Sequence, residues 1–208
     1  MNWHLVSNEQ SSYFHFTWNG YSALYSTKHG QDALLRVLKP IFLKQIHSDI
    51  IVDADSQKER TGDGLVSSRP QYIGLRIADC LPVYLFAQEK VCIIHCGWRG
   101  IIQGIARKAQ EMLKDYHYVL GASINTCCYE VKQDVADRFT KDYAQAIIMR
   151  NGKYFIDLKS TVIKDLGHER LLGALDLCTK CHPEHFYSNR NGDAQRNYAL
   201  LKYGVTDD

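Results

Sequence analysis

Short alternations of hydrophobic and polar residues fill the first half of the chain and predict mainly β-strands there. The apolar runs are rich in β-branched and aromatic residues and are separated by turn residues. We expect strands at residues 13–17, 41–46, 50–52, 64–67, 72–77, 82–86 and 91–95. A short helix at residues 31–38 ends before Pro40.

Apolar residues recur at steps of three and four in the second half, which predicts helices whose apolar stripes face the core. The longest helix is predicted over residues 101–116, on the stripe Ile101, Ile105, Ala109, Met112 and Tyr116. Further stripes consist of Val131, Val135, Phe139 and Tyr143, and of Val162, Ile163 and Leu166.

The third stripe has a candidate N-cap near Ser160, and a last segment from Ala194 ends at Gly204. Strands are predicted between the helices, at residues 118–124, 154–157 and 185–187. Strands and helices thus mix without strict βαβ alternation, and this pattern predicts an α+β fold with mixed β-sheets flanked by helices.

Composition favours one globular domain over residues 1–208. The chain is 45% hydrophobic and 23% charged, and its four prolines and the lack of a Ser/Gly-rich stretch leave no obvious linker. The 25 Lys+Arg and 23 Asp+Glu residues give a net charge of only +2 and are scattered, which argues against a nucleic-acid partner. Without a leader or a membrane-length apolar run, we expect a cytoplasmic protein that binds no membrane.

Three residues with metal-binding side chains interrupt apolar strand ends: His47, Cys80 and His95. A hairpin that turns at residues 88–90 would set His95 opposite Val83, three residues from Cys80. One thiolate and two imidazoles are a zinc donor set, and three protein ligands leave a fourth position for water or substrate. A single histidine is more often a surface or core residue, so the shared position at strand ends is what favours a catalytic metal site.

The segment Cys96-Gly97-Trp98-Arg99-Gly100 follows His95 directly. A glycine-flanked turn before a helix presents backbone N–H groups and the Arg99 guanidinium to an anion. The alternative is a tight turn in which Trp98 packs into the core. Seven cysteines, with Cys127 and Cys128 adjacent, are an odd set in a chain too long to need disulfide bonds, so we expect reduced thiols.

Six motifs, in order, resemble the signatures of one known family. They are Gln45-Ile46-His47, Gly62-Asp63-Gly64-Leu65-Val66, Ala78-Asp79-Cys80-Leu81-Pro82-Val83, His95-Cys96-Gly97-Trp98-Arg99-Gly100, Cys127-Cys128-Tyr129-Glu130-Val131 and Phe186-Tyr187-Ser188-Asn189-Arg190. The chain is similar to the laccase-domain family over residues 40 to 200. This family is also called the polyphenol oxidase or peptidoglycan editing factor family and contains purine nucleoside phosphorylases.

The resemblance implies that His47, Cys80 and His95 bind Zn²⁺, with Cu²⁺ as the less favoured metal. It implies phosphorolysis of adenosine, inosine or methylthioadenosine, with adenosine deamination as a further activity. The partners would be a purine nucleoside and phosphate, held by Arg99 and Arg190, in a monomer or homodimer. The implied fold is similar to that of deamidating toxins with a Cys/His dyad. Asp79 would be a catalytic or proton-transfer group, or would only cap a turn.

The amino-terminal region departs from the family pattern, because an Arg-x-Gly-Gly segment, a Leu-Asn pair and an Asn-Arg pair are missing before Ile41. Arg190 and Arg196 match the family's arginines, although Ala194-Gln195 replaces the Thr-Gly that normally precedes the second one. Substrate contacts made by the first residues of relatives are therefore not expected here.

Four alternatives remain open. A metal-free amidase or deamidase would use Cys80 as nucleophile and His95 as base, in peptidoglycan precursor editing. Polyphenol oxidation by a multicopper cluster fits less well, because the chain has no His-x-His pair. A structural zinc module would combine Cys178-x-x-Cys181 with His182 or His185, although we find no second cysteine pair nearby in sequence. The fourth alternative is a binding protein that has lost its chemistry.

Overall fold

Two six-stranded β-sheets and one three-stranded sheet are formed in the part of the chain that the computed structural model describes, residues 2–56 and 59–204. The first sheet has the order β1 (His4–Ser7), β2 (Ser12–Trp18), β3 (Tyr21–Ser26), β15 (Asn197–Lys202), β7 (Tyr72–Ile77), β4 (Ile41–Phe42). The second has the order β14 (Leu171–Ala174), β10 (His117–Leu120), β8 (Leu81–Ala87), β9 (Lys90–Cys96), β6 (Gly64–Ser67), β5 (Ile51–Asp53). The third consists of β11 (Glu130–Val131), β13 (Lys153–Ile156) and β12 (Ile147–Arg150).

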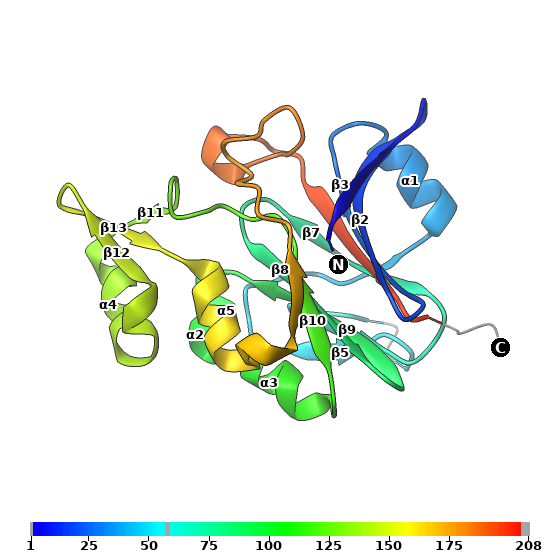
Figure 1. The fold of residues 1–208 in the computed structure, drawn as a ribbon, viewed down its shortest axis with the longest axis horizontal. Helices are drawn as coiled ribbons and strands as arrows, with labels where there is room; N and C mark the ends of the chain where they lie inside the picture. The colour runs from blue at the N-terminus through cyan, green and yellow to red at the C-terminus, as the bar shows by residue number, and fades with distance from the viewer. Residues whose placement is uncertain (1, 57–58, 205–208) are drawn as a thin grey trace.

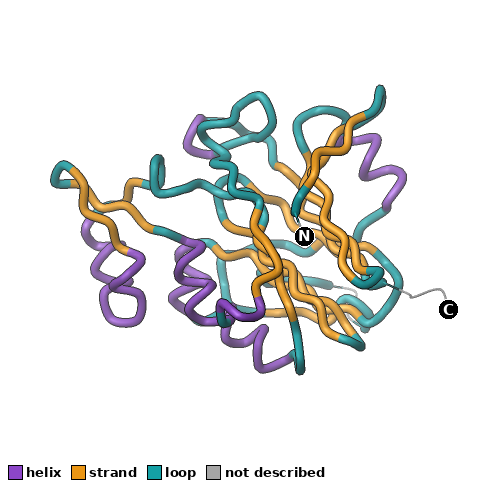
Figure 2. The backbone as a smooth tube through the Cα atoms, viewed as in Figure 1, coloured by secondary structure: helices purple, strands orange, loops and turns teal. Residues whose placement is uncertain are grey.

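The helices lie on the outer sides of this two-sheet stack (Figure 1). Leu34 of α1 (Gln31–Leu38) packs on Leu24 and Leu200 of the first sheet. The second sheet is covered by α2 (Trp98–Gln103), α3 (Ile105–Met112) and α5 (Leu158–Leu166), with α4 (Gln133–Tyr143) next to the third sheet. Short 3₁₀ turns occupy Ala144–Ala146, His168–Arg170 and Asn189–Asn191. Figure 2 shows α1 apart from the other helices, on the side of the first sheet.

The second sheet is the middle layer, which explains why β8 and β9 read as continuous apolar runs. Along β8, Leu81, Val83 and Leu85 face the helices, whereas Tyr84 and Phe86 face the first sheet. Successive side chains of a strand point to opposite faces, so a strand buried on both faces must be apolar throughout. Cys80 directly precedes β8 and His95 lies near the end of β9, so these interior strands determine where both residues lie.

The structure confirms the predicted α+β class, with β2, β5 to β9, β13 and α1 at or near their predicted places. The predicted helix over residues 101–116 is wrong in its bounds. It is divided into α2 and α3 by Gly104, whose φ of 91° lies in the left-handed region that favours glycine. It also ends at Met112, which is exposed, so that the buried Tyr116 lies beyond it.

Four other predictions need correction. The segment from Ala194, which was grouped with the helical stripes, instead contains strand β15, which is hydrogen-bonded between β3 and β7. Residues 185–187 form no strand, although Phe186 is fully buried between aromatic rings. The predicted strand over 41–46 is reduced to Ile41–Phe42, and that over 118–124 ends at Leu120.

Two predicted helix starts also shift. Val131 belongs to β11 and not to the helix that follows, because α4 begins at Gln133. The N-cap of α5 is Asp157 and not Ser160: its carboxylate accepts hydrogen bonds from the backbone N–H groups of Lys159 (3.0 Å) and Ser160 (3.1 Å). Such a cap satisfies N–H groups that have no partner within the helix.

Candidate metal centre

His95 is the second-to-last residue of β9, at the end of the β8–β9 ladder away from the hairpin turn, and is almost completely buried. It pairs with Pro82 and not with Val83 as predicted, which brings it one residue closer to Cys80. Its Nδ1 is 2.8 Å from Oδ1 of Asp63, which precedes β6. In the neutral imidazole, Nδ1 donates to this carboxylate and Nε2 offers its lone pair to a metal ion.

His47 and Asp79 both have positive φ angles, of 59° and 81°, which non-glycine residues rarely adopt. His47 follows β4 in an exposed loop, and Asp79 precedes Cys80 in the turn between β7 and β8. Backbone strain of this kind persists where surrounding contacts impose it, and it is concentrated at functional sites. Here it directs one imidazole and one thiol toward His95.

The potential ligand atoms of His47, Cys80 and His95 all lie within 4.8 Å of one another. The two imidazole rings are 5.0 Å apart between centroids and nearly perpendicular, at 69°. A methyl group at Gly97 would lie 3.0 Å from the Cys80 sulfur and 3.5 Å from Cδ2 of His47, so this glycine keeps the space beside the ligands open. The donor set and this space fit a zinc ion with three protein ligands.

Asp63 holds two of these candidate ligands at once, a role that was not predicted from the sequence. One carboxylate oxygen binds His95, and the other accepts from the backbone N–H groups of Ile46 (3.2 Å) and Ser48 (2.5 Å), which flank His47. The Ser48 hydroxyl adds a further hydrogen bond. The signal in the sequence was a charged residue between Gly62 and Gly64, ahead of an apolar strand.

The electrostatics of the site favour a thiolate. Burial alone would raise the pKa of Cys80, but the neighbouring His95 and the hydrogen bond with His47 lower it to about 6. Burial would lower the pKa of His95, yet Cys80 and Asp63 on either side raise it to about 9. Burial likewise opposes ionisation of Asp63, but hydrogen bonds from His95 and Ser48 hold its pKa at about 2. Without a metal ion, these groups form a thiolate–imidazolium–carboxylate chain.

A cavity of about 600 Å³ opens over the three candidate ligands and is strongly cationic. Its lining includes five basic side chains, those of Lys44, Arg76, Arg99, Arg190 and Arg196. Its one acidic side chain, Asp79, is buried and accepts from the Thr179 hydroxyl (2.7 Å) and from the backbone N–H of Arg190 (2.8 Å). Asp79 therefore holds the Arg190 segment in place, and the cavity suits an anionic ligand.

The predicted anion turn is only partly as expected. Gly97 caps α2, which has six residues and ends at Gln103, so no long helix adds its dipole to the site. The positive charge comes from arginine side chains. Arg99 is exposed and its guanidinium lies 4.4 Å from the centre of the Trp98 ring. Arg190 lies 5.3 Å from the centre of the Tyr129 ring and donates to the Glu130 carbonyl (2.9 Å).

Residues 28–201 match the family described as multi-copper polyphenol oxidoreductase laccase. The chain belongs to this family. The motifs had indicated a similarity that starts at residue 40, whereas the match starts at residue 28. Strands β1 to β3 still lie outside it. The described residues contain no helix with the length and apolar character that membrane crossing requires.

Relatives in this laccase-like family carry the name purine nucleoside phosphorylase. One from Clostridium acetobutylicum is 32% identical and covers 92% of this chain and 91% of its own. One from Borreliella burgdorferi is 34% identical over 77% of each chain. Among solved structures, a Neisseria meningitidis protein has a TM-score of 0.81 at 22% identity, covering 93% of this chain and 99% of its own. YlmD from Geobacillus stearothermophilus has a TM-score of 0.81 at 20% identity, over 97% and 99% of the two chains.

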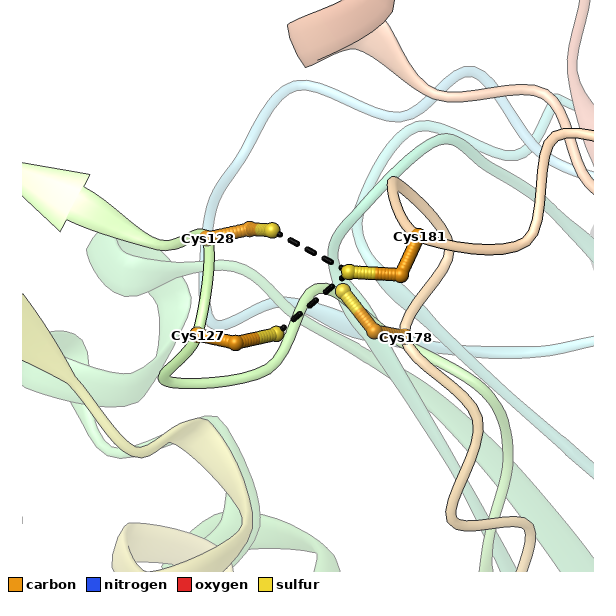
Figure 3. A group of neighbouring side chains, drawn as sticks. All are labelled: Cys127, Cys128, Cys178 and Cys181. Carbon is orange, nitrogen blue, oxygen red and sulfur yellow. Dashed lines mark hydrogen bonds between the residues drawn. The ribbon is translucent and has the colours of Figure 1, made fainter.

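The structural zinc alternative required His182 or His185 beside Cys178 and Cys181, but neither histidine belongs to their cluster. Nδ1 of His182 lies 2.9 Å from a carboxylate oxygen of Glu184, and the His185 ring packs against Phe14. Their neighbours are instead Cys127 and Cys128, the second cysteine pair that the sequence separation had concealed (Figure 3).

Proposed function

We propose that this protein catalyses the phosphorolysis of purine nucleosides, namely inosine, adenosine or methylthioadenosine, and that it also deaminates adenosine. The observation that carries the proposal is the union of two features in one cavity: a Cys/His/His donor set and five cationic side chains. The first suits a metal ion and the second suits phosphate. The relatives named purine nucleoside phosphorylase support the same reaction.

His47, Cys80 and His95 would hold a zinc ion, with Asp63 orienting His95. When bound, the ion supplies Lewis-acid activation of water or substrate at its open position. The same donors bind copper in electron-transfer sites, where a methionine, a glutamine or a backbone oxygen adds a weak axial bond. A multicopper cluster would need His-x-His pairs, and the chain has none, so we favour zinc over copper and phosphorolysis over polyphenol oxidation.

Arg99 and Arg190 would hold phosphate beside the nucleoside, because both residues line the cavity, Arg99 from α2 and Arg190 from the 3₁₀ turn at Asn189–Asn191. A phosphate oxygen would form a bond to the ribose anomeric carbon while the glycosidic bond to the purine breaks. The electron pair leaves with the base, which gains a proton, and ribose 1-phosphate remains. The two arginines would promote this step by position and by screening the charge of the attacking phosphate.

The Tyr129 and Trp98 rings line the same cavity beside Arg190 and Arg99, and their apolar surface would contact the purine. Tyr129 is nearly buried and its position is fixed by the neighbouring Cys128 and Glu130 backbone, whereas Trp98 begins α2. Asp79 acts here as a positioning residue, because both of its oxygens already hold the segment that carries Arg190.

A second candidate function rests on the Cys80–His95 pair. A thiolate with a pKa of about 6 beside a histidine that carries the proton is the arrangement of a cysteine nucleophile. In that case the protein would be an amidase or deamidase that works without metal. Asp63 would then orient the general base, as the third member of the catalytic group.

Turnover of inosine and adenosine with and without phosphate separates the two functions. We expect free base only when phosphate is present, together with ribose 1-phosphate in equal amount, and loss of activity in Cys80→Ser, His47→Ala and metal-stripped protein. Zinc should restore the stripped wild type but not the variants. Absence of turnover of every purine nucleoside, combined with amide hydrolysis by zinc-free protein that alkylation of Cys80 abolishes, would favour the amidase.

A further inference from the structure

Four cysteines outside the catalytic cavity converge from two distant segments of the chain (Figure 3). Cys127 and Cys128 lie in the loop before β11, and Cys178 and Cys181 lie in the loop after β14. The two loops are joined by a parallel bridge between Ser123 and Cys178, and by a hydrogen bond from the Thr179 N–H to the Ser123 carbonyl (3.0 Å). The backbone therefore holds the sulfurs together independently of any bond between them.

The sulfur positions fit one tetrahedral metal ion. The Cys181 sulfur lies 3.6 Å from that of Cys127 and 3.3 Å from that of Cys128, and all four sulfurs are within 4.8 Å of one another. Zinc–sulfur bonds of about 2.3 Å in a tetrahedron place the sulfurs about 3.8 Å apart. An iron–sulfur cluster distributes its cysteines over several irons and needs a wider arrangement than this one.

The loop around Cys178 has hydrogen bonds suited to a metal-bound thiolate. The backbone N–H of Asn125 donates to the Cys178 sulfur (3.4 Å), and those of Lys180 and Cys181 donate to it as well. The N–H groups of Cys181 and His182 also donate to the Cys178 carbonyl, each at 3.1 Å, which curls the Cys-x-x-Cys segment into a tight turn. Such donors delocalise the negative charge of a thiolate, as hydrogen bonds to metal ligands generally do.

Charge around the cluster is also favourable. The Arg150 guanidinium donates to the carbonyls of Thr126 and Cys127, at 3.3 and 3.4 Å, and so places a cation beside the sulfurs. A disulfide would use only two of the four sulfurs, and Cys181 is close to both Cys127 and Cys128, so the geometry selects no single pair. Four thiolates around one ion use every member of the cluster.

We propose that Cys127, Cys128, Cys178 and Cys181 bind a second zinc ion, with a structural role. The ion would fasten together the two loops that form one wall of the catalytic cavity. Tyr129 directly follows Cys128 and lines that cavity. Thr179 directly follows Cys178 and donates to Asp79, which also accepts from the N–H of Arg190. The zinc thus positions the aromatic and cationic side of the cavity from outside it.

The test measures zinc coordination in two variants that separate the sites. His47→Ala removes an exposed ligand of the catalytic site only, and Cys127→Ser/Cys181→Ser removes the two exposed ligands of the cluster only. Cys92→Ala, a buried cysteine outside both sites, is the control for loss of a thiol. After anaerobic purification, we expect two zinc ions per chain in wild type and Cys92→Ala, and one in each of the other variants.

X-ray absorption of the zinc in His47→Ala should show only sulfur neighbours, at about 2.3 Å. Chelator should lower the thermal midpoint of His47→Ala, and adding the two serine substitutions should abolish that shift. Equal zinc content in wild type and the double serine variant would overturn the proposal. So would nitrogen or oxygen neighbours in His47→Ala, or a disulfide at Cys181 in anaerobically purified protein. None of these readouts uses catalytic activity, so the proposal can fail while the proposed function stands.

Discussion

Replacing Asp63 by Asn tests how the metal ligands are held. Asp63 is fully buried and uses both oxygens as acceptors, one for Nδ1 of His95 and the other for the backbone N–H of Ser48 and Ile46. An amide has one acceptor and one donor end, so Asn satisfies only one side. If its oxygen faces His95, its NH₂ group confronts backbone N–H groups, which costs about 1–3 kcal/mol for each unsatisfied buried group.

In the opposite orientation the NH₂ group faces His95 and requires Nδ1 to accept a hydrogen bond. The neutral imidazole then carries its proton on Nε2, the nitrogen needed for the metal. Both orientations weaken zinc binding. Loss of a partner behind a metal-bound histidine typically reduces affinity about 10- to 100-fold. This corresponds to about 1.4–2.7 kcal/mol, since each tenfold change is worth 1.36 kcal/mol.

Competition with a fluorescent zinc chelator measures this affinity directly. Asp165→Asn is the matched control, because Asp165 is also nearly buried and accepts hydrogen bonds from Tyr143 (2.7 Å) and Arg107 (3.3 Å), away from the three ligands. We expect the control to lose stability and to keep its zinc affinity. A folded Asp63→Asn protein with the zinc affinity of wild type would refute the assigned role of Asp63.

Three further predictions follow from single contacts. Arg99→Gln should raise the KM for phosphate about 10- to 100-fold in steady-state kinetics, through loss of charge-assisted hydrogen bonds. Arg138 contacts the same Trp98 ring from outside the cavity, so Arg138→Gln should leave this KM unchanged. Gly97→Ala should weaken zinc binding in the chelator assay, because the new methyl group lies 3.0 Å from the Cys80 sulfur. Burial opposes ionisation of Asp55, but hydrogen bonds from Ser67 and Ser68 lower its pKa overall. Its stabilising effect is therefore present above about pH 4 and is lost as the pH falls below it, so urea unfolding of Asp55→Asn should vary less with acid pH than that of wild type.

The sequence predicted the interior strands well because their apolar runs are uninterrupted and bounded by turns. Both β6 and β7 have the predicted bounds, and β8 and β9 extend the predicted strands by one residue at each end. Errors arose where tertiary contacts decide the conformation. The stripe Ile101, Ile105 and Ala109 does face the core, but Gly104 divides the helix that carries it. Phe186 is buried by neighbouring rings without belonging to a strand.

The three metal-ligand candidates were found because each lies at or just after the end of an apolar run, and the structure brings them together. What the sequence could not show is contact between distant segments. Asp63 and His95 are 32 residues apart, and Cys127 and Cys181 are 54 apart. The pairing of β6 with β9 creates the first contact, and the bridge between Ser123 and Cys178 allows the second. Neither pairing has a local sequence signal.

Anomalous diffraction at the zinc edge tests the central claim most directly. Crystals of wild-type protein purified without added metal should show an anomalous peak about 2.0–2.3 Å from an imidazole nitrogen of His47, the Cys80 sulfur and Nε2 of His95. A soaked phosphate should lie against Arg99 in the same cavity. Crystals of active protein that show no anomalous peak among these three side chains would contradict the proposed zinc site.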